Sequence, residues 1–185
     1  SACWPTRDNV TMAEIVQSNI ELVGMPEWTG KDQDLARRIQ KAAEVDVIGL
    51  RTDISPLREA RQSASSNDSG DITWTVPHGR VSFPANVPGV PFHHWAAGIA
   101  EATPIAHKGT VAGAKVMAGS VVDLLTTPEL LQKAKETFSQ EVAGSTYESL
   151  LPPDKKPPIG MNAAEMAKYR EAMKAHYLKV PIRFK

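Results

Sequence analysis

The N-terminal part of the chain carries apolar residues at the spacing of amphipathic helices. From Thr11 to Gly24, one helical face collects the larger apolar side chains, namely Met12, Ile15, Val16, Ile20 and Val23. The order Thr-Met-Ala-Glu from Thr11 to Glu14 predicts a capping box, and Gly24 is a typical helix stop. A second helix is predicted from Thr29, with an apolar stripe formed by Leu35, Ala36, Ile39, Ala42 and Ala43.

Short apolar runs in the middle of the chain predict strands. The sequence DVIGL at 46–50 is one candidate. The sequence RVSFPANV at 80–87 has the β-branched and aromatic content of another, ended by Pro88 and Gly89. Between them, residues 61–71 are small and polar and predict a loop.

The longest predicted helix runs from Pro104 to about Leu125 and is unusually rich in small residues. Glycine or alanine stands at 109, 112, 113, 118 and 119, so a neighbouring element has to pack very close to this helix. We expect this face to lie against strands that include 79–85, with Lys108 and Lys115 directed away from the contact.

Two further helices are predicted towards the C-terminus. Thr127–Glu129 combines a capping threonine, a proline at the first helical position and an acid in the first turn, which favours a helix to about Val142. Asn162 and Glu165 open a last helix through Ala175. Because the evident strands are too few for a sheet, the chain reads as the last part of an α/β domain whose other strands lie elsewhere.

The composition excludes several functional classes. Lysine and arginine total 21, as do aspartate and glutamate, so we expect neither a nucleic-acid surface nor an acidic tail. The single cysteine, Cys3, leaves no internal disulfide framework and fits a reducing compartment. With no basic and apolar leader visible in the first residues, we expect a cytoplasmic protein. The most apolar helix carries Lys115 and Asp123, which indicates a core helix rather than a membrane span.

No complete catalytic motif is present in the sequence. It lacks Gly-x-Gly-x-x-Gly, a phosphate loop, His-Glu-x-x-His and Gly-x-Ser-x-Gly. One polar cluster, SNDSGDITW, places Asp68, Gly70 and Asp71 where backbone N–H groups and carboxylates could face a substrate. The alternative is a capped turn with Asp71 as the N-cap of a short helix.

A second polar cluster is the pair His93 and His94, which follows a proline-rich approach. Neutral imidazole binds zinc, but adjacent residues in an extended chain point in opposite directions. At most one of the pair is therefore expected to ligate a given ion, and a purely structural role is the alternative. Of the other histidines, we expect His107 to be partly buried, His176 to lie at the surface and His78 to follow a turn.

Several of these stretches resemble a known family. The sequences SNDSGDITWTVP (66–77), NVPGVPFHHWAAGIAEATPIAHKGTVAGAKV (86–116) and DLLTTPELLQKAKETF (123–138) resemble the C-terminal part of the aminobenzoyl-glutamate utilisation protein B group. That group belongs to the zinc amidohydrolases and carboxypeptidases of the aminoacylase-like family. Residues 11–40 look like the stretch that follows the lid, or dimerisation, domain of those enzymes. The resemblance covers nearly the whole chain and is weakest at 45–62.

The resemblance implies a fold and a domain organisation. Family members have an α/β catalytic domain of three layers, α/β/α, interrupted by a lid domain that usually dimerises. This chain would be the C-terminal part of that catalytic domain, helix-rich with few strands of its own. Residues 1–45 would be the helical segment after the lid, and 63–185 the active-site loop, a strand and the C-terminal helices. The upstream catalytic half and the lid would lie outside this sequence, and a homo-oligomer through the lid is expected.

The resemblance also assigns residues to a site. His93 matches the family's late zinc ligand in a Gly-His-Ser-Trp or Gly-His-Asn-Trp motif, whereas Phe92 replaces its glycine and His94 replaces its serine or asparagine. The NDSGD sequence matches the family's active-site loop. The substrate-binding candidates are Asp68, Gly70, Asp71 and His94. Two zinc ions, or other divalent metals, are expected in the intact enzyme, with the other ligands and the general-base glutamate upstream, so no catalytic residue is assigned here.

These features predict part of a metal-dependent amidohydrolase that hydrolyses an amide bond of an N-acyl amino acid such as aminobenzoyl-glutamate. On its own the chain is expected to be inactive, because a catalytic zinc needs about three protein ligands. Two alternatives stay open: a non-catalytic binding or assembly module derived from this family, and a helical interaction protein whose histidine pair is structural.

Overall fold

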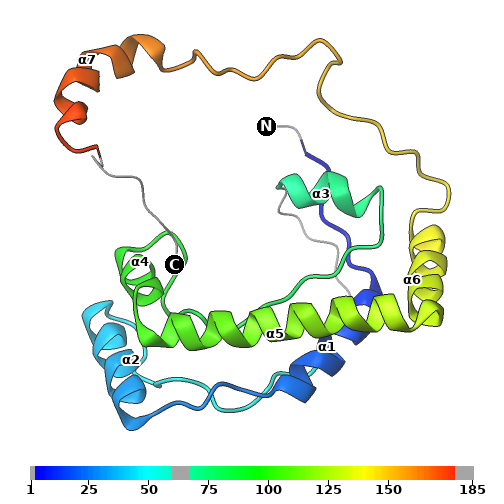
Figure 1. Ribbon diagram of the computed structural model, residues 1–185, viewed down its shortest axis with the longest axis horizontal. Coiled ribbons are helices and arrows are strands. Elements are labelled where there is room, and N and C mark those ends of the chain that lie inside the picture. The colour runs from blue at the N-terminus through cyan, green and yellow to red at the C-terminus, as the bar shows by residue number, and fades with distance from the viewer. Residues whose placement is uncertain (1–2, 60–66, 178–185) are drawn as a thin grey trace. The chain divides into compact units, whose positions relative to one another are not determined.

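Helices form nearly all of the regular structure. The computed structural model describes residues 3–59 and 67–177, and the chain divides into two compact units, Ser1–Leu150 and Leu151–Lys185. The helices of the first unit are α1 (Val10–Val23), α2 (Gly30–Ala42), α3 (Asp68–Thr73), α4 (Trp95–Glu101), α5 (Pro104–Thr126) and α6 (Pro128–Glu141) (Figure 1). The second unit contains α7 (Ala163–Lys174). No helix in the described ranges combines the length and apolar character that a membrane crossing needs.

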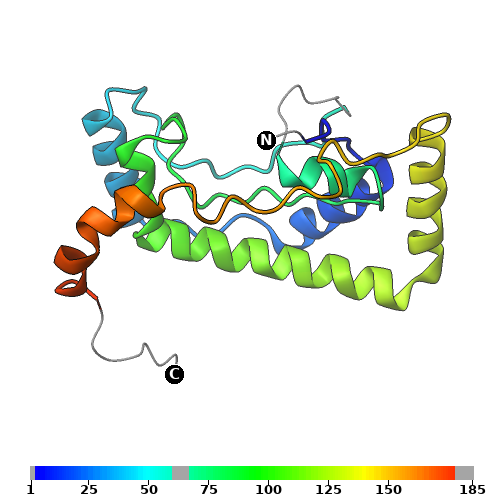
Figure 2. The same cartoon turned by 90° about the horizontal axis from the view of Figure 1, so that it is seen from above.

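The long helix α5 organises the first unit. Helices α1 and α6 pack on it and on each other, α4 packs on α5, and α2 packs on α4 (Figures 1 and 2). The main core lies where α2, α4 and the first turn of α5 meet the segment 87–90. Its buried side chains are Ala36, Ile39, Leu50, Val87, Val90, Ala96, Ala97, Ala100 and Ile105. The predicted helices from Thr29, Pro104 and Pro128 are therefore confirmed, and their packing is helix on helix.

The glycines of α5 mark where another chain segment approaches its backbone. A Cβ atom at Gly109 would stand 2.3 Å from the carbonyl oxygen of Pro84, and one at Gly113 would stand 2.6 Å from the ring of Phe83. The predicted contact between this face and residues 79–85 is confirmed. Lys108 points to α2 and not to this contact, as its Nζ donates to Asp32 Oδ2 at 2.7 Å, and Lys115 is exposed.

The predicted strand at 46–50 is wrong. Its backbone bonds to side chains of α2 instead of to another strand. Gln40 Oε1 accepts from Gly49 N at 2.8 Å while its Nε2 donates to Gly49 O at 3.2 Å, and Gln33 forms the same pair of bonds with Leu50. Two glutamines seven residues apart on one helix therefore satisfy backbone N–H and C=O groups of a segment that has the composition of a strand.

The predicted strand at 80–87 is also absent. Residues 3–59 and 67–177 contain no β-strand apart from an isolated bridge at Pro5. Within these ranges the backbone groups of residues 79–82 make no hydrogen bond, and Pro84 has no N–H to donate. The segment is extended and packs on α5 through Phe83 and Pro84. Its strand-like residues therefore serve packing on a helix and do not pair with another strand.

The start of α1 differs from the prediction. Asn9 is its N-cap and accepts from Met12 N at 3.0 Å, whereas Thr11 lies inside the helix. Thr11 is buried and shares a 2.9 Å hydrogen bond with Thr137 of α6. The predicted capping box at Thr11 and Glu14 is therefore wrong, because the threonine serves a helix–helix contact. The stop at Gly24 is confirmed, with φ of 75°.

Helix α2 begins as predicted. Thr29 and Asp32 form a reciprocal capping box, and Ala36 and Ile39 of the predicted stripe are buried. Ala42, also assigned to that stripe, is exposed. The stripe is therefore narrower than the periodicity indicated.

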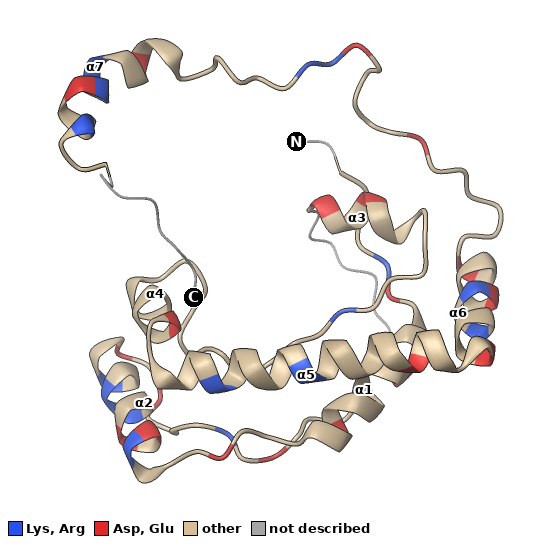
Figure 3. Cartoon of the chain, viewed as in Figure 1, with Lys and Arg blue, Asp and Glu red and all other residues tan. Residues whose placement is uncertain are grey.

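The described residues of the second unit, 151–177, are nearly all exposed. None of the residues of α7 is buried, and the proline-rich segment 151–160 that precedes it is exposed. Two exposed ion pairs, Lys168–Glu165 and Lys174–Glu171, each at 2.7 Å, lie on its helix. Figure 3 shows acidic and basic residues interspersed along this unit and the first, with few charges on α5.

Candidate functional site

The histidine pair stands at the junction between a loop and α4. His93 is exposed and has a left-handed backbone with φ of 63°, which is uncommon for a residue other than glycine. His94 is extended and is the N-cap of α4, where its Nδ1 accepts from Ala96 N at 3.2 Å. Its ring contacts that of Trp95, with 5.3 Å between centroids. The two histidines therefore have different roles: the His94 ring binds its own backbone, and the His93 ring faces outward.

The predicted active-site loop is a short helix in its described part. Asn67 is the N-cap of α3 and accepts from Ser69 N at 2.9 Å, so the alternative with Asp71 as N-cap is wrong. Residues 61–66 of the predicted loop lie outside the described residues. Asp68 is exposed in the first turn of α3. Of the carboxylates assigned to substrate, Asp68 is thus the more accessible.

Asp71 and Gly70 hold the N-terminal segment against α3. Asp71 Oδ1 accepts from Trp4 N at 3.1 Å. Gly70 is buried, and a Cβ at this position would stand 1.8 Å from the carbonyl oxygen of Trp4. On the next turn, Thr73 Oγ1 accepts from Arg7 N at 3.1 Å. The segment around Trp4 therefore lies along α3, with its backbone in direct contact with the helix.

An aromatic cluster completes this contact. The ring of Trp4 lies 4.6 Å from that of Trp74 and 5.9 Å from that of Tyr147, centroid to centroid. The Arg7 guanidinium stands 4.5 Å from the centre of the Trp74 ring. Desolvation, and then the nearby charge of Asp71, raise the pKa of Tyr147. Sequence reasoning missed this cluster, because its members come from segments far apart in the chain and share no motif.

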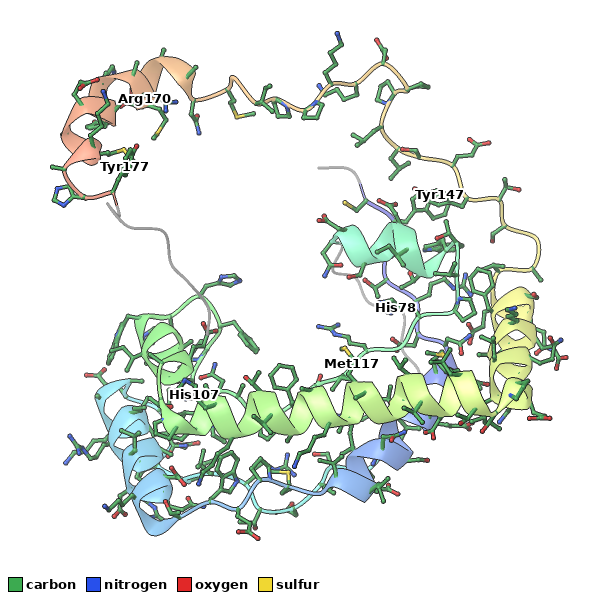
Figure 4. The ribbon with its side chains drawn as sticks, in the orientation of Figure 1. His78, His107, Met117, Tyr147, Arg170 and Tyr177 are labelled. Carbon is green, nitrogen blue, oxygen red and sulfur yellow. The ribbon has the colours of Figure 1, made fainter. Side chains whose placement is uncertain are left out.

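The candidate residues form two separate groups within the first unit. Helix α4 lies at the start of α5, whereas α3 lies beside the N-terminal segment, away from α4 (Figures 1 and 2). Figure 4 shows the same separation, with His107 at the start of α5 and Tyr147 beside α3. His107 is exposed, so its expected partial burial is wrong, and His176 is exposed as predicted. The described part of this chain does not bring His93 and Asp68 together.

One cavity of the first unit lies at neither group. It has a volume of about 700 Å³ and opens between α1, α5 and the extended segments 50–59 and 78–84. Its lining includes the apolar side chains of Val16, Ile20 and Val116 and the basic side chains of Arg58 and Arg80. None of the predicted site residues lines it.

A zinc site needs more ligands than the described residues bring together. In the described ranges, no three histidine, cysteine, aspartate or glutamate side chains gather closely enough to hold a metal ion. The exposed ring of His93 is a suitable single ligand, but a complete zinc site takes about three or four protein ligands. The described residues alone therefore do not form one.

Comparison with curated proteins identifies a relative. The chain is 25% identical over 182 residues to one subunit of the p-aminobenzoyl-glutamate hydrolase of Escherichia coli (strain K12). The resemblance predicted from the sequence is confirmed. The match covers 84% of this chain but only 38% of that relative's length, so the chain corresponds to a part of this relative. No protein-family model matches the chain, and no solved structure matches it. The name of the relative supports a hydrolase family.

Proposed function

We propose that this chain is part of a metal-dependent amidohydrolase that hydrolyses an amide bond of an N-acyl amino acid such as aminobenzoyl-glutamate. The similarity to the p-aminobenzoyl-glutamate hydrolase over 84% of the chain carries this proposal. The two sequences that carry the resemblance lie at the starts of helices in the first unit. The NDSGD sequence begins α3, and the histidine pair directly precedes α4. Cytoplasmic location and oligomerisation through a lid domain stay predictions.

The exposure and the existing contacts of each candidate side chain indicate its proposed role. His93 is the proposed metal ligand, and its outward-facing ring supports this role. Asp68 is the proposed contact to the substrate, since its carboxylate is exposed on α3. Gly70, Asp71 and His94 stay proposed substrate-site residues in their two separate groups, where their contacts hold the local backbone. A bound zinc pair would supply an acidified water and polarise the scissile carbonyl.

An exposed apolar surface on α5 supports the view that further polypeptide completes the domain. The outer face of α5 is largely apolar, with Lys115 at its edge. Its apolar residues are Val111, Ala114, Ala118, Val121, Val122 and Leu125. The valines and the leucine of this face are between 49% and 77% exposed. Exposed apolar patches of this kind usually mark a contact surface. Together with the unbonded backbone at 79–82, this favours the three-layer α/β/α arrangement in the intact protein, with the missing strands supplied from upstream.

The test uses the longest natural polypeptide that contains this sequence, identified by intact-mass measurement of the source. Release of aminobenzoate from aminobenzoyl-glutamate and the zinc content are measured for the parent, His93→Ala and His107→Ala. We expect His93→Ala to lose most of the hydrolysis and part of the zinc, because one ligand is removed from the site. His107→Ala, an exposed histidine on α5, is the matched control and is expected to keep both. Equal activity of all three proteins would refute the proposal.

The outer face of α5 also favours a second candidate, a non-catalytic binding or assembly module. Large exposed apolar patches mark interaction surfaces in general, whether or not the assembly is an enzyme. Metal content separates the two functions. A module would contain no stoichiometric zinc in its natural full-length form and would be unaffected by His93→Ala.

A further inference from the structure

Helix α3, which carries the proposed substrate contact Asp68, is held in place by contacts with the N-terminal segment (residues 4–9) (Figure 1). Among the described residues, the helices that pack extensively on one another do not include α3. Instead, Asp71 and Thr73 of α3 both accept hydrogen bonds from backbone N–H groups of this segment. A helix of six residues is not stable without tertiary contacts, so the segment determines where α3 lies.

Two indole N–H groups tie this contact to the rest of the unit. Trp74, the C-cap of α3, donates from Nε1 to the carbonyl oxygen of Pro5 at 2.8 Å. In the other direction, Trp4 Nε1 donates to the carbonyl oxygen of Glu148 at 2.7 Å. The two indole rings contact each other, and the Trp4 ring also contacts that of Tyr147. The Trp4 side chain therefore links α3 to the part of the chain that follows α6.

The other end of the N-terminal segment is anchored to α6. Arg7 Nη2 donates to the carbonyl oxygen of Glu141, and Asn9 Nδ2 donates to the carbonyl oxygen of Ala134 at 3.1 Å. Asn9 and Ala134 are both buried. Asn9 is also the N-cap of α1, which packs on α5 and α6. The segment therefore joins α3 to helices that have a packed core of their own.

We propose that Trp4 is a positioning residue for the substrate site: its indole keeps the N-terminal segment in place and so fixes α3 with the Asp68 carboxylate. The inference rests on the proposed function only in taking Asp68 as a substrate contact. Removal of the indole leaves the backbone bond from Trp4 N to Asp71 available. It removes the bond to Glu148 and the ring contacts, so α3 should open locally while the packed helices stay intact.

The first test measures local opening of α3 in the 185-residue chain. Hydrogen exchange detected by NMR follows two amides: that of Val76, bonded to Ile72 O of α3, and that of Ala43, bonded to Ile39 O of α2. In Trp4→Ala the Val76 amide should exchange roughly tenfold faster, while the Ala43 amide keeps its rate. Trp4→Phe should have a smaller effect, because phenylalanine keeps an aromatic ring and loses only the N–H donor.

Trp28→Phe is the matched control for Trp4→Phe. Trp28 Nε1 also donates to a backbone carbonyl oxygen, that of Arg51, at 2.8 Å. This control loses the same kind of bond and should leave the Val76 amide unchanged. Unchanged Val76 exchange in Trp4→Ala would overturn the proposal. Equal acceleration of the Val76 and Ala43 amides would overturn it as well, because Trp4 would then act on the stability of the whole unit.

The second test measures how Trp4 affects substrate binding in the natural full-length protein. Loss of a contact made equally in the ground state and the transition state raises KM and leaves kcat unchanged. We therefore expect KM for aminobenzoyl-glutamate to rise about fivefold in Trp4→Ala, the effect of one weakened hydrogen bond, and less in Trp4→Phe. Trp28→Phe should keep the parent KM. In an Asp68→Asn background, Trp4→Ala should add little, because both changes act through one contact.

The outcomes separate the positioning role from the proposed function. Independent effects of Trp4→Ala and Asp68→Asn on KM would overturn the positioning role, as would a fall in kcat with KM unchanged. Absence of hydrolysis in the parent, with the exchange result as expected, would refute the proposed function and leave the role of Trp4 in holding α3 intact.

Discussion

Lys108 and Asp32 join the start of α2 to the first turns of α5. Lys108 Nζ lies 2.7 Å from Asp32 Oδ2, and the Asp32 side chain is only 8% exposed. The Lys108 hydrogen bond, followed by the bonds from the backbone and hydroxyl of Thr29, lowers the pKa of Asp32 to about 2. The nearly buried carboxylate is thus held charged by contacts from two helices.

This pair predicts a loss of stability in acid. The pKa of Asp32 is lower in the folded chain, about 2, than its reference value of 3.8, so its contribution is present above the reference value and lost as pH falls towards 2. The contribution is about 2 kcal/mol at most, since Lys108 stays partly solvated. Urea unfolding between pH 6 and pH 2 should show this loss in the parent and a smaller pH dependence in Asp32→Asn. An unchanged pH dependence would contradict the assignment.

Replacing the lysine tests the same contact from α5. Lys108→Met leaves Asp32 without its cation and should destabilise the chain by about 1–3 kcal/mol at neutral pH. Lys115→Met is the matched control, because Lys115 is exposed on the same helix and has no ion pair within the described residues. Urea unfolding of both variants at one pH gives the comparison. Equal losses would mean that the lysine acts through helix propensity and not through Asp32.

Gly70 should not tolerate a side chain. In Gly70→Ala the new Cβ would meet the carbonyl oxygen of Trp4, a backbone atom that cannot move without detaching the N-terminal segment from α3. We expect a destabilisation of about 2 kcal/mol and a red shift of tryptophan fluorescence. Gly98→Ala in α4 is the control, since nothing lies within 4 Å of that position and alanine favours helix. If Gly70→Ala were as stable as the parent chain and had the same tryptophan fluorescence, Trp4 would not contact α3.

Gln40 should be more sensitive to substitution than Gln33. Gln40 is fully buried and bonds to Gly49 N, Gly49 O and Pro88 O, so Gln40→Leu leaves buried backbone groups unsatisfied. The expected loss is about 3 kcal/mol, whereas Gln33→Leu, at a partly exposed site, should cost about 1 kcal/mol because water replaces its bonds. Chemical denaturation measures both. The reverse order would indicate that water reaches Gln40.

Local chemistry made the helices predictable, and distant partners made their details unpredictable. The Thr29 cap and the Gly24 stop depend on residues within one turn, and both were correct. Thr11 looked like a cap because its partner Thr137 lies in α6 and leaves no trace in the local sequence. The strand at 46–50 failed for the same reason, since its bonding groups are glutamines of α2.

At the candidate site, the sequence indicated which segments are of interest. It did not indicate the structural role of each residue within them. Both polar clusters were found from residue type, and the resemblance that they carry is confirmed. The left-handed backbone of His93 and the cap made by His94 depend on the loop geometry, which the sequence pattern alone does not encode. Likewise, the hydrogen bond from Trp4 N to Asp71 joins residues that are 67 positions apart in the sequence.

Asp71 should control the titration of Tyr147. Desolvation is the main cause of the raised pKa of Tyr147, and the negative charge of Asp71 is the next, so Asp71→Asn should lower this pKa without restoring its ordinary value. The asparagine oxygen can still accept from Trp4 N, so the Trp4 amide should stay protected from exchange in Asp71→Asn and lose protection in Asp71→Ala. NMR titration of the three tyrosines measures the effect, with Tyr169 and Tyr177 as internal references and Asp68→Asn as the matched charge control. A Tyr147 titration that does not respond to Asp71→Asn, or responds equally to Asp68→Asn, would show that the Asp71 carboxylate points away from this cluster and is available to a substrate instead.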